Sequence, residues 1–277
     1  MRTRIALALL LVAFFLGSRY FDSLQPSRSS SHQTSYSDFT LLSWNVGYFD
    51  YETDSRAHDE DLEHIASVIG EAGPDCVSLQ EIAAPYQVAR LQGFLGGRYP
   101  HAAWARGFRT DRYVVLLSRM ALAGRTVINT RAGRDAIAAT VQPRDSLPAI
   151  TVVTCHADAY HSRRRRHYVN DLIQWHRETQ SGPVLLAGDF NFDLSPVESS
   201  DLFTDDKKND SEAYSLILEN FRDLGREGGP TGSFDRRIDY AFLSGTRYAP
   251  AEFRVLHGNL RGRMDHHPLL LTLQAAR

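Results

Sequence analysis

The sequence predicts an α/β domain in which two packed mixed β-sheets are flanked by helices. Predicted helices alternate irregularly with many strand-like apolar runs, and several neighbouring runs are joined only by short turns. A strictly parallel, doubly wound sheet would need a helix between nearly every pair of strands. The composition, 43% hydrophobic and 23% charged, is that of a globular protein. About 240 residues remain after the N-terminal segment, which is enough for one large domain.

Three segments predict helices, because apolar residues recur in them at spacings of three and four. The first helix is expected to end at Gly73 and Pro74, which stop helical structure. The helices are expected over residues 57–73, 163–179 and 211–221.

Short apolar runs bounded by turn residues predict the strands. Two pairs of consecutive runs are separated only by short turns, which is typical of hairpins. In chain order, the strands are expected over residues 39–46, 76–82, 112–119, 123–130, 135–143, 149–157, 182–190, 236–244 and 267–274.

Residues 1–21 predict a signal peptide or a membrane anchor. Arg2 and Arg4 precede an apolar run that begins at Ile5, and this run is shorter than the roughly 17–25 residues of a spanning helix. The length favours a signal peptide, but "LGSRYF" matches a cleavage site poorly, so an uncleaved membrane tether through residues 5–17 stays open. Either alternative places the folded domain outside the cytoplasm, in the periplasm, secreted, or anchored to a membrane.

A serine-rich linker is expected over residues 22–38, followed by a single folded domain over residues 39–277 that we expect to be monomeric. The net charge of -2 argues against a globally basic surface for nucleic acid. Cys76 and Cys155 lie in apolar runs without metal-ligand spacing, which predicts buried free thiols and leaves a disulfide open.

Polar residues interrupt or end several predicted strands. They are, in chain order, Asn45, Glu81, His156, Asp189, Asn191, Asp239, Asp265 and His266. Carboxylates and amides are rarely buried without partners, but they can meet one another around a cation. Oxygen ligands without zinc-like spacing favour Mg²⁺, with Mn²⁺ as a substitute. Each residue alone also fits an ordinary turn or a solvated strand end, so the joint pattern carries the prediction.

The predicted site has the parts needed to hydrolyse a phosphate ester. Glu81 and Asn45 would leave a cation with an open coordination face, which Mg²⁺ sites commonly share with substrate phosphate. His266 would be oriented by a carboxylate such as Asp239. A metal ion, an oriented histidine and amides together suit phosphoester hydrolysis.

The order of short motifs along the chain resembles that of the endonuclease/exonuclease/phosphatase superfamily of metal-dependent phosphoesterases. The resemblance runs from about residue 40 to the end and rests on "SWNVG", "SLQEI", "LLSR", "TCHAD", "AGDFN", "RRIDYAF" and "MDHHP". It implies a DNase I-like four-layer α/β sandwich with two mixed sheets between helices. It also implies a divalent cation and a phosphodiester substrate, either nucleic acid or phospholipid.

The resemblance further implies roles for the metal-binding and water-activating residues. Asn45 and Glu81 resemble the metal-binding pair, with Glu81 the principal ligand, and Asp265 would lie near the metal. Asp189 resembles the acid that activates or positions the attacking water, and Asn191 would orient that water or the phosphate.

The histidines are assigned in the same way. His266 resembles the histidine that contacts the phosphate or transfers a proton, and Asp239 its orienting carboxylate. His156 resembles a phosphate contact that stabilises the pentacovalent transition state, whereas His267 is interpreted as structural. Many relatives carry an asparagine where Val114 stands, which puts a secondary contact in doubt.

Basic and aromatic residues near these motifs are candidate substrate contacts. Four consecutive arginines, Arg163, Arg164, Arg165 and Arg166, could grip a nucleic-acid backbone or an anionic lipid head group, or they could be a solvated helix start. Three further arginines could widen this basic rim, and three aromatic residues could stack on a base, touch a lipid surface or cover the core. These are Arg106, Arg109 and Arg112, and Tyr48, Phe49 and Tyr51.

The sequence therefore predicts a magnesium-dependent phosphodiesterase acting as a nuclease. A phospholipid or sphingolipid phosphodiesterase, or a phosphatase, is the alternative within enzymes. A catalytically silent binding module on the same scaffold is the alternative from another class, and the complete set of polar residues disfavours it.

Overall fold

The computed structural model describes residues 38–47, 55–143, 147–179, 182–194 and 204–276. The signal peptide or anchor over residues 1–21 and the aromatic residues Tyr48, Phe49 and Tyr51 lie outside the described residues, as does the predicted linker except for Asp38. Asp38 is the first residue of a strand rather than the last of the linker. Within the described ranges, no helix has the length and apolar character required to cross a membrane.

The first sheet has six strands and is mixed. β1 and β2 are parallel and are connected through helix α2, whereas the other neighbouring pairs are antiparallel. Across the sheet the order is β11 (Tyr248–Val255), β12 (Leu269–Ala275), β1 (Asp38–Asn45), β2 (Cys76–Ile82), β4 (Tyr113–Ser118) and β3 (His101–Ala105).

The second sheet is built in the same way. β7 and β8 are its parallel pair, connected through helix α4, and the other neighbouring pairs are antiparallel. Across the sheet the order is β5 (Ala123–Ile128), β6 (Ala136–Val141), β7 (Ile150–His156), β8 (Val184–Asp189), β10 (Asp239–Leu243) and β9 (Arg222–Asp223).

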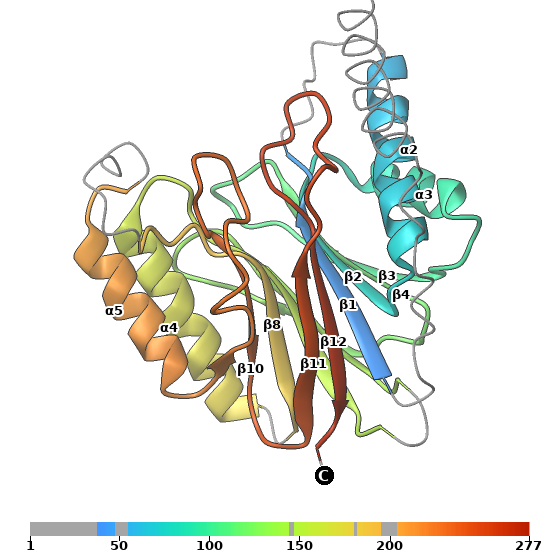
Figure 1. Ribbon diagram of the computed structural model, residues 1–277. Coiled ribbons are helices and arrows are strands. Elements are labelled where there is room, and N and C mark those ends of the chain that lie inside the picture. Colours follow the sequence, from blue (N-terminus) through green and yellow to red (C-terminus); the bar gives the residue numbers. More distant parts are fainter. Residues whose placement is uncertain (1–37, 48–54, 144–146, 180–181, 195–203, 277) are drawn as a thin grey trace, which may run out of the picture. The chain divides into compact units, whose positions relative to one another are not determined.

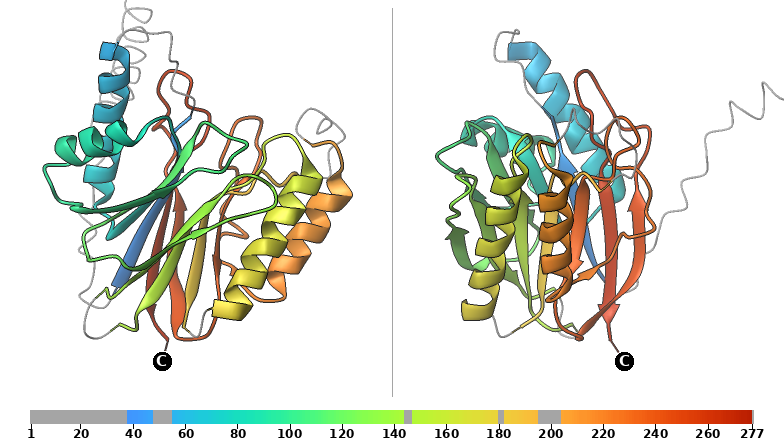
Figure 2. Two further views of the ribbon diagram at one scale, coloured as in Figure 1. Left: turned by 180° about the vertical axis from the view of Figure 1, so that it is seen from behind. Right: turned by 90° about the vertical axis from the view of Figure 1, so that its left-hand side faces the viewer.

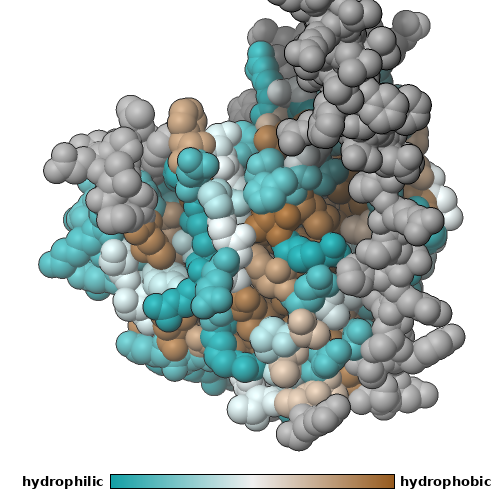
Figure 3. All heavy atoms as spheres, in the orientation of Figure 1, coloured by the Kyte–Doolittle hydropathy of each residue, from teal (hydrophilic) through white to brown (hydrophobic). Residues whose placement is uncertain are grey.

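Helices cover the outer faces of both sheets, which completes the predicted four-layer sandwich (Figures 1 and 2). α2 (Ser55–Ala72) and α3 (Pro85–Phe94) pack on the first sheet, and α4 (Ser162–Thr179) and α5 (Lys207–Leu218) pack on the second. The outer edge of the α4–α5 pair, on the left in Figure 3, is largely hydrophilic.

Alternation along the strands explains why both faces of each sheet are buried. In β1, Leu41 belongs to the core between the two sheets, whereas Leu42 belongs to the core under α2 and α3. In β7, Val152 faces the central core and Val153 faces α4 and α5. Successive strand side chains point to opposite faces, so continuous apolar runs are required where both faces are covered.

All the predicted helices and strands are present. The predicted hairpin of residues 135–143 and 149–157 is confirmed as β6 and β7, but the one of residues 112–119 and 123–130 is wrong, because β4 belongs to the first sheet and β5 to the second. The structure adds four elements that the sequence pattern missed. They are α3, β3, β9 and β11. β11 is an edge strand whose pairing shifts register between Pro250 and Glu252, and a proline there interrupts the apolar alternation. α5 begins at Lys207, earlier than predicted, because the Asp206 side chain caps it by accepting from the Lys208 amide. Cys76 and Cys155 are buried free thiols, as predicted.

Candidate active site

Three neighbouring strands of the second sheet present a row of polar residues at one end. His156 closes β7, Asp189 closes β8 and Asp239 opens β10. Asp189 is the direct register partner of both His156 and Asp239. The hydrogen-bonded ladders therefore set the spacing of these three residues, because directly opposed side chains in a sheet are close neighbours.

Gly188 allows β7 and β8 to approach closely just before this row. Its φ is +146°, and a Cβ atom built there would lie 2.0 Å from the Cys155 carbonyl oxygen. A side chain would push the two strands apart, so a glycine is required directly before Asp189. The apolar run "VLLAG" thus ends where the strand delivers its carboxylate to the site.

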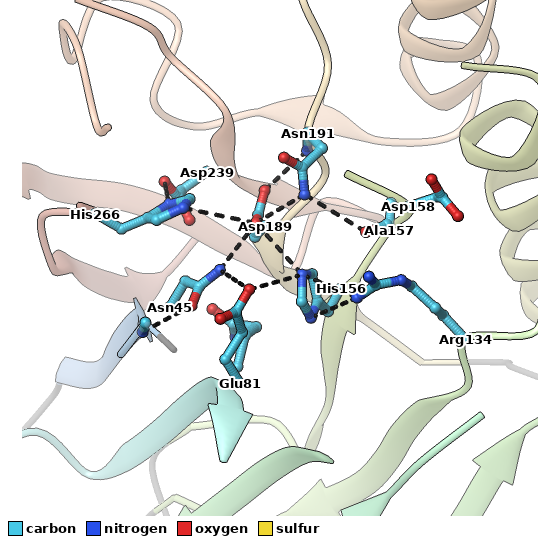
Figure 4. A network of polar contacts seen from close by, with 12 residues as sticks. Asn45, Glu81, Arg134, His156, Ala157, Asp158, Asp189, Asn191, Asp239 and His266 are labelled. Carbon is cyan, nitrogen blue, oxygen red and sulfur yellow. Dashed lines mark hydrogen bonds and ion pairs between the residues drawn. The ribbon is translucent and has the colours of Figure 1, made fainter. Parts of the chain in front are cut away.

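The first sheet contributes Asn45, at the end of β1, and Glu81, near the end of β2. Glu81 has a φ of 66° and lies where the pairing of β2 with β4 shifts register between Leu79 and Ile82. A positive φ is uncommon for a residue with a side chain and is typically kept at functional sites. The bulge directs the Glu81 carboxylate, whose side chain is 20% exposed, toward Asn45 and His156 (Figure 4).

Asp189 is the centre of the polar network (Figure 4). Its Oδ2 accepts from the Asn45 amide at 3.0 Å and from the Asn191 amide at 2.8 Å. Its Oδ1 accepts from the Asn191 backbone N–H at 2.9 Å, and Asn191 takes a φ of 52°, which asparagine tolerates. Asn45 also donates to Glu81 Oε1 at 3.3 Å, so one amide joins the acids of the two sheets.

His266 and Asp239 form a buried pair. His266 Nδ1 lies 2.9 Å from Asp239 Oδ2, which leaves Nε2 on the side of Asp189, at 3.9 Å from its Oδ2. Thr231 Oγ donates to the same Asp239 oxygen at 2.7 Å, and the Trp44 indole donates to the His266 carbonyl at 2.8 Å. The ring is thereby held in one orientation, as predicted for a histidine paired with a carboxylate.

The two site histidines have opposite charge preferences. Burial alone would lower the pKa of His266, but the Asp239 and Asp189 carboxylates raise it to about 10, so this ring carries a proton at neutral pH. Burial, together with Arg134 and His266, holds the pKa of His156 well below its usual value, so this ring is neutral. Because His156 is neutral, its approaches to Glu81 and Asp189, 3.7 and 3.6 Å, are polar contacts rather than ion pairs.

Burial also raises the pKa values of both acids that face each other across the site. For Asp189 burial is the main cause, opposed by His266 and reinforced by Asp239. For Glu81 burial again dominates and is opposed by the hydrogen bond from Asn45. Perturbed carboxyl groups of this kind are characteristic of catalytic sites.

Arg134 is a site residue that the sequence analysis missed. Its guanidinium Nη1 lies 3.1 Å from both ring nitrogens of His156. Arg134 follows Gly133 in the turn before β6, where no apolar periodicity surrounds it. The glycine directly before this arginine was the only local signal in the sequence.

The remaining predicted residues lie around this centre. Asp265 is at the rim, with a side chain that is 60% exposed and an oxygen 3.7 Å from His266 Nε2. His267 packs edge-on against His257, in keeping with a structural role. Val114 is buried in the core between the sheets, so no polar side chain takes its place there.

The prediction that Arg165 contacts substrate is wrong. Its side chain is fully buried and binds Asp210 through two hydrogen bonds, at 2.6 and 2.8 Å. The same guanidinium donates to Thr204 Oγ at 2.6 Å and to the Asp158 carbonyl at 3.0 Å. Arg165 is therefore a structural link between α4, α5 and the loop after β7.

The other three arginines of the run are at the surface. Arg164 pairs with Asp158 in the loop after β7, at 3.2 Å. Arg166 pairs with Glu212 of α5 at 2.6 Å, and it lines with Arg163 a surface hollow on α4 that none of the polar residues of the site lines. The structure therefore brings neither Arg163 nor Arg166 to the site.

The donor atoms of the site fit a divalent cation with oxygen ligands. Asp239 Oδ1 is buried and has no hydrogen-bond partner among the described residues. One ligand-type atom of Asp189 and one of Asp239 lie within 4.8 Å of each other and of His266, whose protonated ring is not itself a ligand. Glu81 is the accessible carboxylate on the opposite side. Asn45 turns its amide nitrogen toward the acids, since its oxygen accepts from the Gly47 N–H at 3.0 Å.

Comparison with solved structures supports the same fold. The chain resembles an endonuclease/exonuclease/phosphatase from Beutenbergia cavernae DSM 12333, with a TM-score of 0.69, 20% identity, and coverage of 87% of this chain and 72% of the other. It resembles one from Bacteroides vulgatus with a TM-score of 0.67, 17% identity, and coverage of 86% and 99%. It also resembles TDP2 from Caenorhabditis elegans, with a TM-score of 0.62, 15% identity, and coverage of 86% of this chain and 74% of the other.

The chain matches no curated protein sequence. A sequence model of the Endonuclease/Exonuclease/phosphatase family matches residues 42–260, which include Asn45, Glu81, His156, Asp189 and Asp239 and end before Asp265, His266 and β12. The histidine–carboxylate pair, the registered row on the second sheet and this match agree, and the chain belongs to the endonuclease/exonuclease/phosphatase family, whose members are generally hydrolytic phosphoesterases.

Proposed function

We propose that this protein is a Mg²⁺-dependent phosphodiesterase that acts as a nuclease. The observation that carries the proposal is the convergence of five strand-end residues from two sheets on one site. They are Asn45, Glu81, His156, Asp189 and Asp239. No structural core needs so many polar groups side by side, and a silent binding module would have no use for them.

Glu81 is the residue best suited to hold the cation. It is an accessible carboxylate that a strained backbone presents to the site. Asp265 at the rim would supply a further oxygen. Bound there, Mg²⁺, or Mn²⁺ in its place, would offset negative charge on the phosphate oxygens of the substrate.

Asp189 and Asn191 would act on the attacking water. The pKa of Asp189 is raised toward neutrality by burial, which suits a carboxylate that accepts a proton from water. The Asn191 amide is held by Asp189 at 2.8 Å and would orient the water or a phosphate oxygen beside it.

His266 and His156 would contact the phosphate from opposite sides. His266, protonated through its pairing with Asp239, would donate from Nε2 to a phosphate oxygen or to the leaving group. His156 and the Arg134 guanidinium beside it would stabilise the charge that develops on the phosphate in the transition state. These roles require no movement of the second sheet.

A substrate panel tests the reaction. The purified protein is incubated with plasmid DNA, RNA, sphingomyelin, phosphatidylinositol phosphates and an aryl phosphodiester, each with Mg²⁺, with Mn²⁺ and with chelator. We expect metal-dependent cleavage of nucleic acid. Cleavage of the lipids alone would replace the nuclease by the phospholipid or sphingolipid phosphodiesterase, and cleavage only of terminal phosphates would indicate a phosphatase. Failure to hydrolyse any ester would favour the silent binding module.

We further propose that the enzyme acts outside the cytoplasm. The support is the sequence alone, in which Arg2 and Arg4 precede the apolar run that begins at Ile5. Cell fractionation of the full chain tests this. Recovery with membranes would indicate a tether, and recovery in the soluble extracytoplasmic fraction would indicate a cleaved secretion signal. Recovery of the full chain with cytoplasmic proteins would contradict the proposal.

A further inference from the structure

A cavity of about 630 Å³ opens directly beside the catalytic residues. Glu81, Arg134 and His156 form its inner wall, and Phe108 and Tyr160 line it farther out. In Figure 4, Arg134 reaches His156 from the side of the site away from His266, which is the side of this cavity. A substrate whose phosphate lies against His156 would therefore place its adjoining group in the cavity.

The two aromatic side chains of the cavity are unusually exposed. Phe108 is 76% exposed and Tyr160 is 73% exposed. Aromatic rings this exposed on a protein surface are characteristic of binding sites, because burying them on a ligand is favourable. Within the described residues these two rings line the same cavity, although they belong to different loops.

Both loops are held firmly. The Arg109 N–H donates to the Gly133 carbonyl at 2.8 Å, and a Cβ atom on Gly107 would lie 2.0 Å from that oxygen. The loop of Phe108 thus packs tightly on the turn that carries Arg134. The backbone N–H of Tyr160 donates to the buried Asp158 side chain at 2.9 Å. Both loops are therefore fixed before a ligand binds, which reduces the conformational entropy that the protein loses on binding.

The charge of the cavity narrows the class of ligand. Four arginines line it, Arg106, Arg109, Arg112 and Arg134, and they outnumber the two carboxylates of the lining, Asp111 and Glu81. Arg112 pairs with Asp111 at 2.8 Å, and the Arg109 guanidinium lies 5.2 Å from the centre of the Phe108 ring. A phosphocholine head group would bring its quaternary ammonium among these arginines, which is unfavourable. An anionic ligand with flat rings matches both the arginines and the aromatic side chains.

We propose that this cavity binds one unpaired nucleotide next to the scissile phosphate, with its base stacked on Phe108 and Tyr160 and its phosphate facing the arginines. This inference rests on the proposed function for the position of the scissile phosphate. A base within a duplex is stacked on its neighbours and cannot enter the cavity without being unpaired. The protein is therefore a nuclease that prefers single strands or frayed ends.

Binding in the presence of chelator tests the cavity without turnover. Fluorescence anisotropy measures the Kd of the full chain for a short labelled single strand and for a series in which one abasic residue is moved along it. We expect one position at which loss of the base weakens binding roughly 5- to 150-fold, the range that stacking one base contributes. In the double variant Phe108→Ala/Tyr160→Ala, the ratio of the Kd for that abasic strand to the Kd for the intact strand falls to about one.

Two further variants are matched controls. Phe94→Ala removes a partly exposed ring from the end of α3, outside the cavity, and leaves the ratio of Kd values as in the unaltered protein. Tyr160→Phe keeps the ring and retains the ratio, which separates stacking from hydroxyl chemistry. Equal thermal unfolding of all variants confirms that none has lost its fold.

Three results would overturn the inference. They are an unaltered protein that binds every abasic strand as tightly as the intact strand, a double variant that keeps the full ratio, and equally tight binding to blunt duplex. Binding to anionic phospholipid vesicles that depends on Phe108 and Tyr160, without any preference for bases, would assign the cavity to lipid instead. Base-dependent binding without cleavage in Mg²⁺ would refute the proposed function and leave the cavity assignment standing.

Discussion

The two sheets build their halves of the active site in different ways. The second sheet uses regular pairing, with His156, Asp189 and Asp239 in direct register and each at most 4% exposed. The first sheet uses an irregularity, with Glu81 at a register shift, at a positive φ and in contact with the cavity. One half is a closed network with set distances, and the other is an accessible carboxylate on a strained bulge of β2.

This difference indicates a division of labour. Groups that transfer protons must keep constant distances, and buried, fully paired networks provide them. A group that holds an exchangeable cation must be reachable from solvent and able to adjust its oxygens, since Mg²⁺ keeps several waters. We therefore expect changes in the second-sheet half to affect turnover and changes in the first-sheet half to affect the metal requirement.

The largest expected effect is on turnover at saturating metal. His266→Ala removes the protonated ring next to Asp189, and general acid–base groups contribute about 10²- to 10⁴-fold to rate. Steady-state kinetics at high Mg²⁺ measure kcat. His267→Ala is the matched control, since this neighbouring ring packs on His257, and it keeps wild-type kcat. Full activity of His266→Ala would refute the assignment of the catalytic half.

The next largest effect is on stability and involves Arg165. Arg165→Met leaves Asp210 buried without its partner, and breaking a buried ion pair in this way costs about 3–5 kcal/mol of unfolding free energy. Urea denaturation measures the loss. Arg163→Met, two residues earlier on the exposed side of α4, should change the unfolding free energy by no more than about 0.5 kcal/mol. Equal losses in the two variants would contradict the structural role of Arg165.

A smaller effect separates the first-sheet half from the second. Glu81→Gln keeps the shape of the side chain and removes its charge. The Mg²⁺ concentration for half-maximal activity should rise at least about tenfold, because even residues that only support metal ligands contribute about 10- to 100-fold to metal affinity. Metal titration of activity measures the shift. If kcat at saturating Mg²⁺ fell while the metal requirement stayed unchanged, the division of labour would be wrong.

The last prediction is a pH dependence of stability in chelator. The pKa of His266 is raised from 6.5 to about 10 in the folded state. The contribution of protonated His266 to the free energy of unfolding is therefore fully present below pH 6.5 and is lost as the pH rises through 10. The difference in Tm between the unaltered protein and His266→Ala should shrink steadily over this range. A constant difference would mean that His266 is not held as a cation by Asp239 and Asp189.

The strand ends were predictable because their signal is local. The apolar run before Asp189, the glycine at 188 and the amide at 191 lie within a few residues of one another. The two-sheet fold followed from the same runs, since a strictly parallel sheet would need a helix between nearly every pair of strands. The edge strand β11 was missed because Pro250 interrupts its alternation. Helix α3 was missed because it is too short to show a clear helical periodicity.

The error on Arg165 and the omission of Arg134 have different causes. Arg165 lies four residues before Val169 and seven before Leu172, so helical spacing alone placed it on the buried face of α4. The run of four like charges concealed that spacing. Arg134 meets His156 only through the pairing of β6 with β7 and the turn before it, a contact that no local pattern encodes.

The direct register of β7, β8 and β10 has a consequence for how this protein can change. The separation of the reacting groups is inherited from main-chain pairing, whereas the aromatic rings and arginines that choose a substrate sit on connecting loops. Exchanging those loops would redirect the enzyme to another ester and leave the chemistry intact. Within this one domain, the paired strands and the connecting loops can therefore change independently of each other.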